Sequence, residues 1–159
     1  MYNYIGDTNY SVDPLGLDNA ADATALNNAM DAADMSRPDC EHAAHHMVSS
    51  NDSRDGMDDA RIHMKNLGVD VNDADNGVFL KRSSKTNISK APELENSHAH
   101  SWVHTKNARK LISQKILATT NKRELKKALK DIRKMHLNGD PRLLTDKSCL
   151  LYTSPSPRD

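Results

Sequence analysis

Two pairs of histidines, one in each half of the chain, place the strongest constraint on how this 159-residue sequence can fold. His45 and His46 are neighbours, whereas His100 and His104 are four residues apart. Imidazole titrates near neutral pH and binds borderline metals, so such pairs are candidates for metal binding or proton transfer. A fold that uses both pairs in one site must bring distant segments of the chain together.

The spacing within each pair predicts a division of roles. Residues four apart in a helix project from one face, about 6 Å apart along the axis, so His100 and His104 can share a metal ion. Neighbours in an extended segment point to opposite sides, so one of His45 and His46 can bind metal while the other faces a substrate. Three ligands with an open position, beside a neutral imidazole that takes a proton from water, suit hydrolysis.

The apolar spacing predicts an α+β domain that is mainly helical. Helices are expected where apolar residues recur every three or four positions, and strands in two short segments beside the histidine and Asn-Gly motifs. The expected helices cover residues 19–35, 57–67, 96–117 and 121–137, and the expected strands cover residues 43–48 and 78–81.

Several residues in these segments carry further expectations. Asn76-Gly77 is a turn dipeptide, and a turn alone would explain both residues, but their position between the histidine motifs favours a role for Asn76 in the site. Trp102 is expected to anchor the core, because the apolar face of its expected helix continues beyond it. Asn121 and Glu124 resemble a capping box at the start of the last helix.

Three segments stand out by their order and spacing: Glu41-His-Ala-Ala-His-His-Met-Val48, Leu67-Gly-Val-Asp-Val-Asn-Asp-Ala-Asp-Asn-Gly-Val-Phe-Leu80 and His100-Ser-Trp-Val-His-Thr-Lys106. Together they resemble the AHH group of HNH/endonuclease VII nucleases, which are toxin domains with a ββα-metal fold. The resemblance covers about Leu26 to Ile116. It implies a ββα-metal core with flanking helices and a metal-dependent endonuclease activity.

The resemblance also implies a role for each motif residue. His46 would be the general base and Asn76 the residue that orients it. The cofactor would be one divalent metal ion, for which zinc, magnesium, manganese and nickel are all candidates. The metal ligands would be His45, His100 and His104.

Two further histidines leave the ligand set open. His98 lies just before the third motif, and His63 lies between the first two. Either could replace His45 as the third ligand. A single histidine is more often a surface or packing residue than a ligand, so the argument for a metal site depends on the motifs occurring together.

Both ends of the chain resemble something other than this nuclease group. Residues 1–17 resemble the end of an Rhs/YD-repeat shell, whose last conserved element is Asp-Pro-x-Gly-Leu, here Asp13 to Leu17. That resemblance implies cleavage near Leu17, an Rhs shell as carrier and an immunity protein encoded next to the toxin. Residues 149–159 resemble read-through of a transposase-based sequencing adapter, so residues 148–159 are set aside as an artefact of that kind. The nuclease domain is expected over residues 18–147.

Composition limits the kind of domain that remains. About 130 residues suffice for one small domain. Hydrophobic residues make up 36% of the chain, with one Trp and one Phe, so a bound metal could supply part of the stability. Outside the final segment the one cysteine is Cys40, which excludes a disulfide framework and a Cys-x-x-Cys zinc knuckle.

No apolar run has the length of a membrane helix, and no signal peptide opens the chain. We therefore expect no membrane partner. Export would depend on the Rhs carrier, with type VI secretion as a candidate route, and the toxin would act in the cytoplasm of a target bacterial cell.

The formal net charge of zero hides an asymmetry. Residues 1–80 hold 4 Lys/Arg against 15 Asp/Glu, whereas residues 81–147 hold 17 against 6. A basic half suits a phosphate backbone, because binding releases counterions, although the two halves could also pair with each other. For each basic residue of the last expected helix, the alternative to a nucleic-acid contact is a solvated surface side chain. The candidate contacts are Lys126, Lys127, Lys130, Arg133 and Lys134.

These features predict a metal-dependent endonuclease toxin, with DNA favoured over RNA. In the expected mechanism His46 removes a proton from water, and the metal polarises the scissile phosphate. The alternative is a metal-stabilised nucleic-acid-binding module without catalysis. A base deaminase is excluded, because neither His-x-Glu nor Pro-Cys-x-x-Cys occurs. The immunity protein is expected to be acidic and to cover the basic helix or the cleft.

Overall fold

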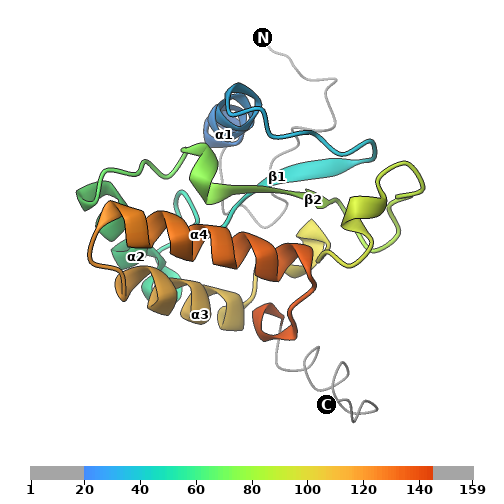
Figure 1. The fold of residues 1–159 in the computed structure, drawn as a ribbon. Coiled ribbons are helices and arrows are strands. Elements are labelled where there is room, and N and C mark those ends of the chain that lie inside the picture. Colours follow the sequence, from blue (N-terminus) through green and yellow to red (C-terminus); the bar gives the residue numbers. More distant parts are fainter. Residues whose placement is uncertain (1–19, 145–159) are drawn as a thin grey trace.

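A two-stranded antiparallel sheet, referred to below as the hairpin, forms the middle layer of the structure (Figure 1), and residues 47–76, which include a helix, connect its strands. Strands β1 (His42–His46) and β2 (Gly77–Lys81) pair antiparallel, with His45 opposite Val78 and His46 opposite Gly77. The computed structural model describes residues 20–144, so the segments that resemble the Rhs shell end and the adapter lie outside the described residues. The prediction of a mainly helical α+β fold is confirmed, and the arrangement is consistent with a small ββα-metal nuclease fold.

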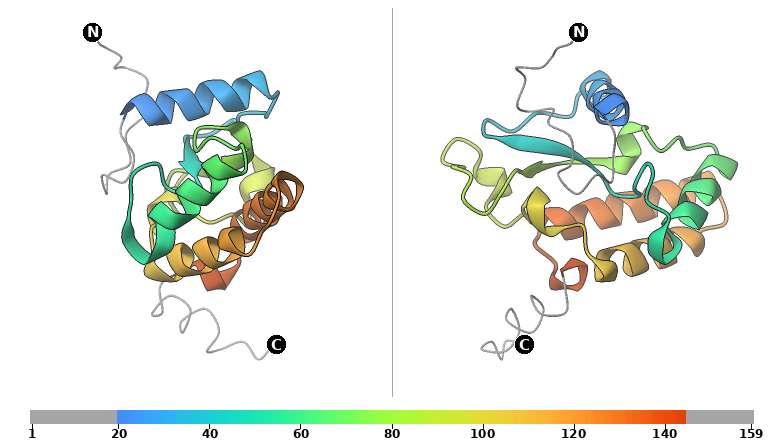
Figure 2. Two further views of the ribbon diagram at one scale, coloured as in Figure 1. Left: turned by 90° about the vertical axis from the view of Figure 1, so that its left-hand side faces the viewer. Right: turned by 180° about the vertical axis from the view of Figure 1, so that it is seen from behind.

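Helices cover both faces of the hairpin (Figures 1 and 2). Helix α1 (Ala20–Ala32) packs on one face, and α4 (Lys122–Leu137) packs on the other. Helices α2 (Met57–Asn66) and α3 (Lys106–Leu117) pack against each other on the α4 side. Among the described residues, no helix is both long enough and apolar enough to cross a membrane.

The alternation of side chains along β2 divides the interior into two cores. Val78 and Leu80 belong to the larger core, which they share with α2, α3 and α4. Phe79 points the other way and packs against Leu26 and Met30 of α1. The hairpin is therefore covered by apolar contacts on both faces, which explains why its strands contain few charged residues.

Gly77 lets α1 approach the hairpin closely. A Cβ atom added at this position would lie 2.5 Å from Sδ of Met30 and 3.0 Å from a methyl carbon of Leu26. The expected turn is a short 3-10 helix, Ala74–Asn76, and the strand begins directly at Gly77. Gly77 is therefore required for the close packing of α1 on the strand, in addition to any role of the Asn-Gly dipeptide in the turn.

The start of α4 matches the expected capping box only in part. The side chain of Asn121 accepts a hydrogen bond from the backbone N–H of Glu124, as the motif predicts. The Glu124 carboxylate, however, accepts from the backbone N–H and the hydroxyl of Thr120. The predicted apolar stripe of α4 is confirmed as buried: Leu125, Leu129 and Ile132.

The prediction of one continuous helix over residues 96–117 is wrong. Helix α3 begins at Lys106, where the side chain of Thr105 accepts a hydrogen bond from the N–H of Ala108. The preceding segment is held by the hairpin instead: Ala99 bridges to Lys81 in a parallel arrangement, and Ser101 N–H donates to the carbonyl of Arg82. These tertiary hydrogen bonds compete successfully with the helical pattern.

The prediction that Trp102 anchors the core is also wrong. Trp102 ends a short 3-10 helix, η5 (His100–Trp102), and its side chain is 50% exposed. The helical face that would have buried it does not exist, because α3 starts four residues later. The neighbouring Val103 is the residue that enters the core.

Candidate active site

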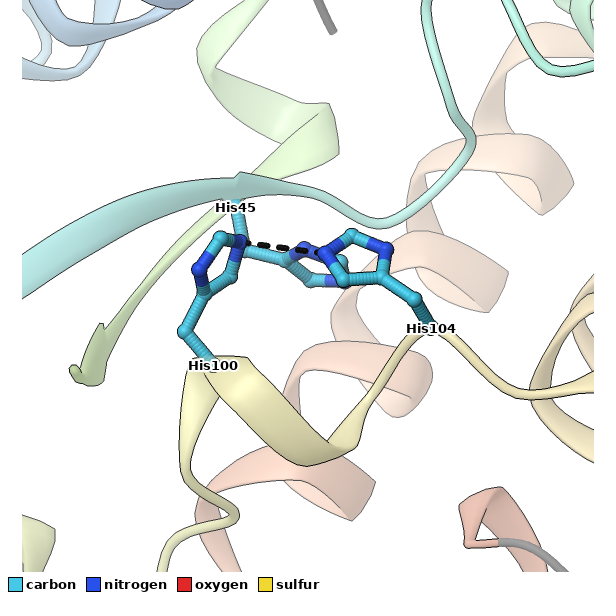
Figure 3. Close-up of side chains that lie close together, drawn as sticks. All are labelled: His45, His100 and His104. Carbon is cyan, nitrogen blue, oxygen red and sulfur yellow. Dashed lines mark hydrogen bonds between the residues drawn. The ribbon is translucent and has the colours of Figure 1, made fainter. Parts of the chain in front are cut away.

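Three histidines from two segments meet on one side of the hairpin (Figure 3). His45 comes from β1, His100 from η5 and His104 from the turn before α3. Each offers one ring nitrogen, and these three nitrogens lie within 4.8 Å of one another. Among residues 20–144 this is the one group of three or more His, Cys, Asp or Glu side chains with the spacing of a metal site.

His100 and His104 meet without the helix that the sequence predicted. Their Nε2 atoms lie 3.3 Å apart, and their ring centroids are 5.0 Å apart. The bridge from Ala99 to Lys81 and the burial of Val103 fix the two ends of the turn that carries them. The pairing of the two rings is therefore a product of the turn and not of helical periodicity.

His45 completes the group from the strand. Its ring centroid lies 5.3 Å from that of His100 and 5.2 Å from that of His104. Burial, together with the neighbouring histidines, holds the pKa of His45 well below its usual value, so the ring is neutral and can offer a lone pair. Its Nδ1 atom is buried and has no hydrogen-bond partner within the part of the chain that the structure describes.

His46 points to the opposite face of β1, as the alternation of a strand predicts. Its Nε2 lies 2.7 Å from Oδ1 of Asn72, and Nδ2 of Asn72 donates to a carboxylate oxygen of Asp22 at 3.2 Å. Because the Asn72 amide donates to Asp22, its oxygen accepts from His46, and Nε2 of His46 carries the proton. Nδ1 is then the basic nitrogen of this ring.

Asn72 and Asp22 were not identified from the sequence. Asn72 lies in a polar loop and Asp22 in the first turn of α1, and nothing in their spacing connects them with His46. A hydrogen bond between residues 26 positions apart in the chain depends on tertiary structure. The structure is needed to find it.

Asn76 holds the backbone that follows His46. Its side chain accepts from the N–H of Val48 at 2.9 Å and donates to the carbonyls of Val48 and Val71. Its own carbonyl accepts from the N–H of Met47. The fully buried Asn76 thus fixes the end of β1, so its predicted orientation of His46 would act through the main chain.

A small cleft opens beside the histidines. It lies between the end of β1 and the start of α3, and its walls carry both charged and apolar side chains. Arg109 lines this cleft and pairs with Asp55 at 2.8 Å. The polar residues around the cleft are His45, His46, Ser49, Asp52, His104 and Arg109.

The two histidines that could have replaced His45 lie elsewhere. Nε2 of His63 lies 2.8 Å from the carbonyl of Thr119, between α2 and the end of α3. His98 faces His136, with 3.5 Å between their Nδ1 atoms. The geometry therefore brings His45, and neither of these alternatives, to His100 and His104.

His136 was overlooked in the sequence. It lies on α4 in the same stripe as Leu129 and Ile132, a position that predicts burial. It is fully buried, and its ring centroid lies 5.0 Å from that of His45. Burial, with the charges of neighbouring histidines, lowers the pKa of His136 to about 3, so this ring is also neutral.

The basic residues of α4 differ in their surroundings. The guanidinium of Arg133 donates to the carbonyls of Gly77, Ala74 and Asp75, and burial lowers its pKa. Lys126 pairs with Asp75 at 3.2 Å, and Lys127 pairs with Asp131 at 3.2 Å. Lys130 and Lys134 are exposed. The nucleic-acid contact stays a prediction for the lysines, whereas Arg133 is held by the protein itself.

The fold and the histidine motifs define a nuclease of the HNH/endonuclease VII superfamily. The model of the AHH family, described as a nuclease family of that superfamily with conserved AHH, matches residues 26–136. The chain therefore belongs to the AHH family, and Ala44-His45-His46 is its namesake motif. Searches of curated proteins and of solved structures gave no match.

The residues present fit the divalent metal ion that nucleases of this superfamily use. Three imidazoles converge on one point, and burial keeps the ring of His45 neutral, as a metal ligand must be. Three nitrogen ligands with an adjoining cleft are typical of a catalytic site with an open position.

Proposed function

We propose that this chain is a metal-dependent endonuclease that hydrolyses phosphodiester bonds, with DNA as the preferred substrate. The observation that carries the proposal is that the three-histidine group and His46 border the same cleft. His46 directly follows His45 in β1, and both line the same cleft. The proposed base and the proposed metal site thus both border one cleft, although their rings leave β1 on opposite faces.

The protein contributes a fixed base and a fixed ligand set. His45, His100 and His104 would hold the metal ion. When bound, the ion would polarise the scissile phosphate and stabilise the developing charge on the leaving oxygen. Nδ1 of His46 accepts a proton from the attacking water, while the bond from Nε2 to Asn72 keeps the ring oriented. Asn76 holds the adjoining main chain.

The biological setting is part of the same proposal. The segment ending in Asp13 to Leu17 resembles the end of an Rhs shell, which supports a role as the toxin domain of an Rhs protein. Delivery would depend on that carrier, and the toxin would act in the cytoplasm of a target bacterium. A cognate immunity protein of acidic character would protect the producing cell.

The proposal is tested with purified protein, plasmid DNA and RNA, with and without a chelator. We expect nicking of DNA that stops on chelation and returns with added divalent metal. His46→Ala should abolish cleavage while metal binding and fold are retained, because only the proton acceptor is removed. The matched control is His63→Ala, which removes a histidine outside the cleft.

Each part of the proposal can fail separately. Metal-independent cutting would overturn the role of the three histidines. Cleavage by His46→Ala at the parental rate would overturn its assignment as the base. Binding of DNA without cleavage under any metal would favour the alternative of a non-catalytic nucleic-acid-binding module.

A further inference from the structure

Three buried histidine rings lie one behind another in the interior of the protein. His45, His136 and His98 are 4%, 0% and 3% exposed, respectively. Each has a buried ring nitrogen without a hydrogen-bond partner among the described residues: Nδ1 of His45, Nε2 of His136 and Nε2 of His98. Buried polar atoms are normally paired, so this concentration of unpaired nitrogens requires an explanation.

The rings are arranged as a row. The centroids of His45 and His136 are 5.0 Å apart, with planes at 81°, and those of His136 and His98 are 5.6 Å apart, with planes at 85°. The Nδ1 atoms of His136 and His98 lie 3.5 Å apart. The backbone N–H of His98 donates to the carbonyl of His136 at 2.9 Å, which fixes the spacing of these two residues.

We propose that His136 orients His45 when the metal binds, because a small rotation of the two adjacent rings would let Nδ1–H of His45 donate to Nε2 of His136; in the structure itself neither nitrogen has a hydrogen-bond partner among the described residues. The inference rests on the role of His45 as a ligand in the proposed function. A histidine that binds metal through one nitrogen carries a proton on the other, and that proton needs an acceptor. In the proposed arrangement Nε2 of His45 binds the metal, which leaves the buried Nδ1 to carry the proton.

The positions of the protons then follow along the row. If Nε2 of His136 accepts from His45 in the metal-bound protein, the single proton of the neutral His136 ring resides on Nδ1. Nδ1–H of His136 donates to Nδ1 of His98, whose proton resides on Nε2. The close approach at Gly139, where a Cβ would lie 2.4 Å from the carbonyl oxygen of Asn96, keeps the segment before His98 against the end of α4.

The test measures Co²⁺ affinity without nucleic acid, by titration and by competition with a chromophoric chelator. Four proteins are compared: the parent, His136→Phe, His136→Gln and the control His63→Gln. Phe fills the space of the ring without an acceptor, whereas Gln places an amide oxygen near the position of Nε2. We expect His136→Phe to weaken Co²⁺ binding by about 10- to 100-fold, as removal of such supporting residues does. His136→Gln and His63→Gln should bind like the parent.

The visible absorption of bound Co²⁺ separates an orienting role from direct ligation. In the proposed arrangement His136→Gln keeps the parental spectrum, because the ligand number is unchanged. A spectrum that shows one ligand fewer would overturn the proposal in favour of His136 as a fourth ligand. If His136→Phe bound Co²⁺ with the parental affinity, the proposal would be overturned, and His136 would serve only to pack the core. Absence of Co²⁺ binding by the parent would overturn the ligand assignment itself.

Circular dichroism and thermal unfolding of the metal-free proteins would show whether His136→Phe misfolds. A second pair of variants tests the proposal independently of that substitution. His98→Leu removes the acceptor for His136, whereas His98→Asn keeps an amide oxygen near Nδ1. We expect weaker Co²⁺ binding in His98→Leu than in His98→Asn. Equal Co²⁺ affinities of His98→Leu and His98→Asn would overturn the proposed hydrogen bond between His136 and His98. Co²⁺ binding does not require nuclease activity, so failure of the proposed reaction leaves this result intact.

Discussion

His46 and Asn72 are joined by a hydrogen bond of 2.7 Å between Nε2 and Oδ1, and this bond ties the proposed base to the loop before β2. Asp22 of α1 accepts from the same Asn72 amide at 3.2 Å and so fixes which of its atoms faces His46. The orientation of the imidazole therefore depends on a helix that lies outside the hairpin.

Removal of this bond should slow catalysis without affecting metal binding. We expect Asn72→Ala to lower kcat by about 10- to 100-fold, a magnitude typical of residues that orient a functional group. KM for DNA and the Kd for metal should stay unchanged, because neither depends on the His46 ring. The control is Asn66→Ala at an exposed position of α2. An unchanged kcat, or an equal loss in the control, would contradict the role of Asn72.

Metal binding should stabilise the folded chain. At a free metal concentration 100 times Kd, we expect about 2.7 kcal/mol of stabilisation. For a domain of this size that corresponds to a rise in Tm of roughly 10 °C. Calorimetry with metal and with chelator measures the difference, which should vanish in His104→Ala and persist in His63→Ala. A metal-dependent Tm in His104→Ala would contradict the ligand assignment.

Asp52 should make stability depend on acid pH. Burial acts to raise the pKa of its carboxyl, but the hydrogen bonds from Arg54 outweigh this effect, and the pKa is lowered. The carboxylate therefore contributes fully above its ordinary pKa, and the contribution is lost as pH falls through the lower folded value. We expect Asp52→Asn to cost about 1 kcal/mol at neutral pH and nothing in strong acid.

Urea unfolding in chelator at both pH values measures this difference. The exposed Asp59→Asn on α2 serves as the control. A constant gap between parent and Asp52→Asn at all pH values would show that the carboxylate is not the group involved.

The exposed lysines of α4 should contribute to nucleic-acid binding without affecting turnover. In a His46→Ala background, which prevents cleavage, we expect Lys130→Gln and Lys134→Gln to weaken DNA binding. The slope of log K against log salt should become less negative by about 0.9 for each phosphate that the protein no longer neutralises. Lys65→Gln, at an exposed position of α2, is the control. Unchanged affinity and slope would assign these lysines to a solvated surface.

Local periodicity is sufficient to predict part of the site. The alternation of side chains in a strand predicts that His45 and His46 lie on opposite faces, and the apolar stripe of α4 predicts its buried side. His136 belongs to that stripe and could have been found by the same reasoning. A polar residue at a helical position that the apolar pattern predicts to be buried is unusual, and it therefore marks a candidate site residue in the sequence.

Tertiary contacts decide the rest. The segment before α3 has helical spacing, yet the bridge from Ala99 to Lys81 and the cap at Thr105 hold it in another conformation. The link between His46 and Asn72 likewise depends on how the loop before β2 folds back onto β1. Neither contact is encoded within a window of neighbouring residues, which is why propensity alone misjudges Trp102.

The placement of His45 and His46 on opposite faces of β1 has a consequence for how such a domain can diverge. One peptide bond joins the proposed metal ligand, whose ring lies against His136 of α4, to the proposed base, which is held through Asn72 from Asp22 of α1. Substitutions in α1 can therefore tune the rate of proton transfer while the choice of metal is inherited unchanged, and substitutions in α4 can do the reverse. Metal binding and proton transfer would then be adjustable separately, from two different helices.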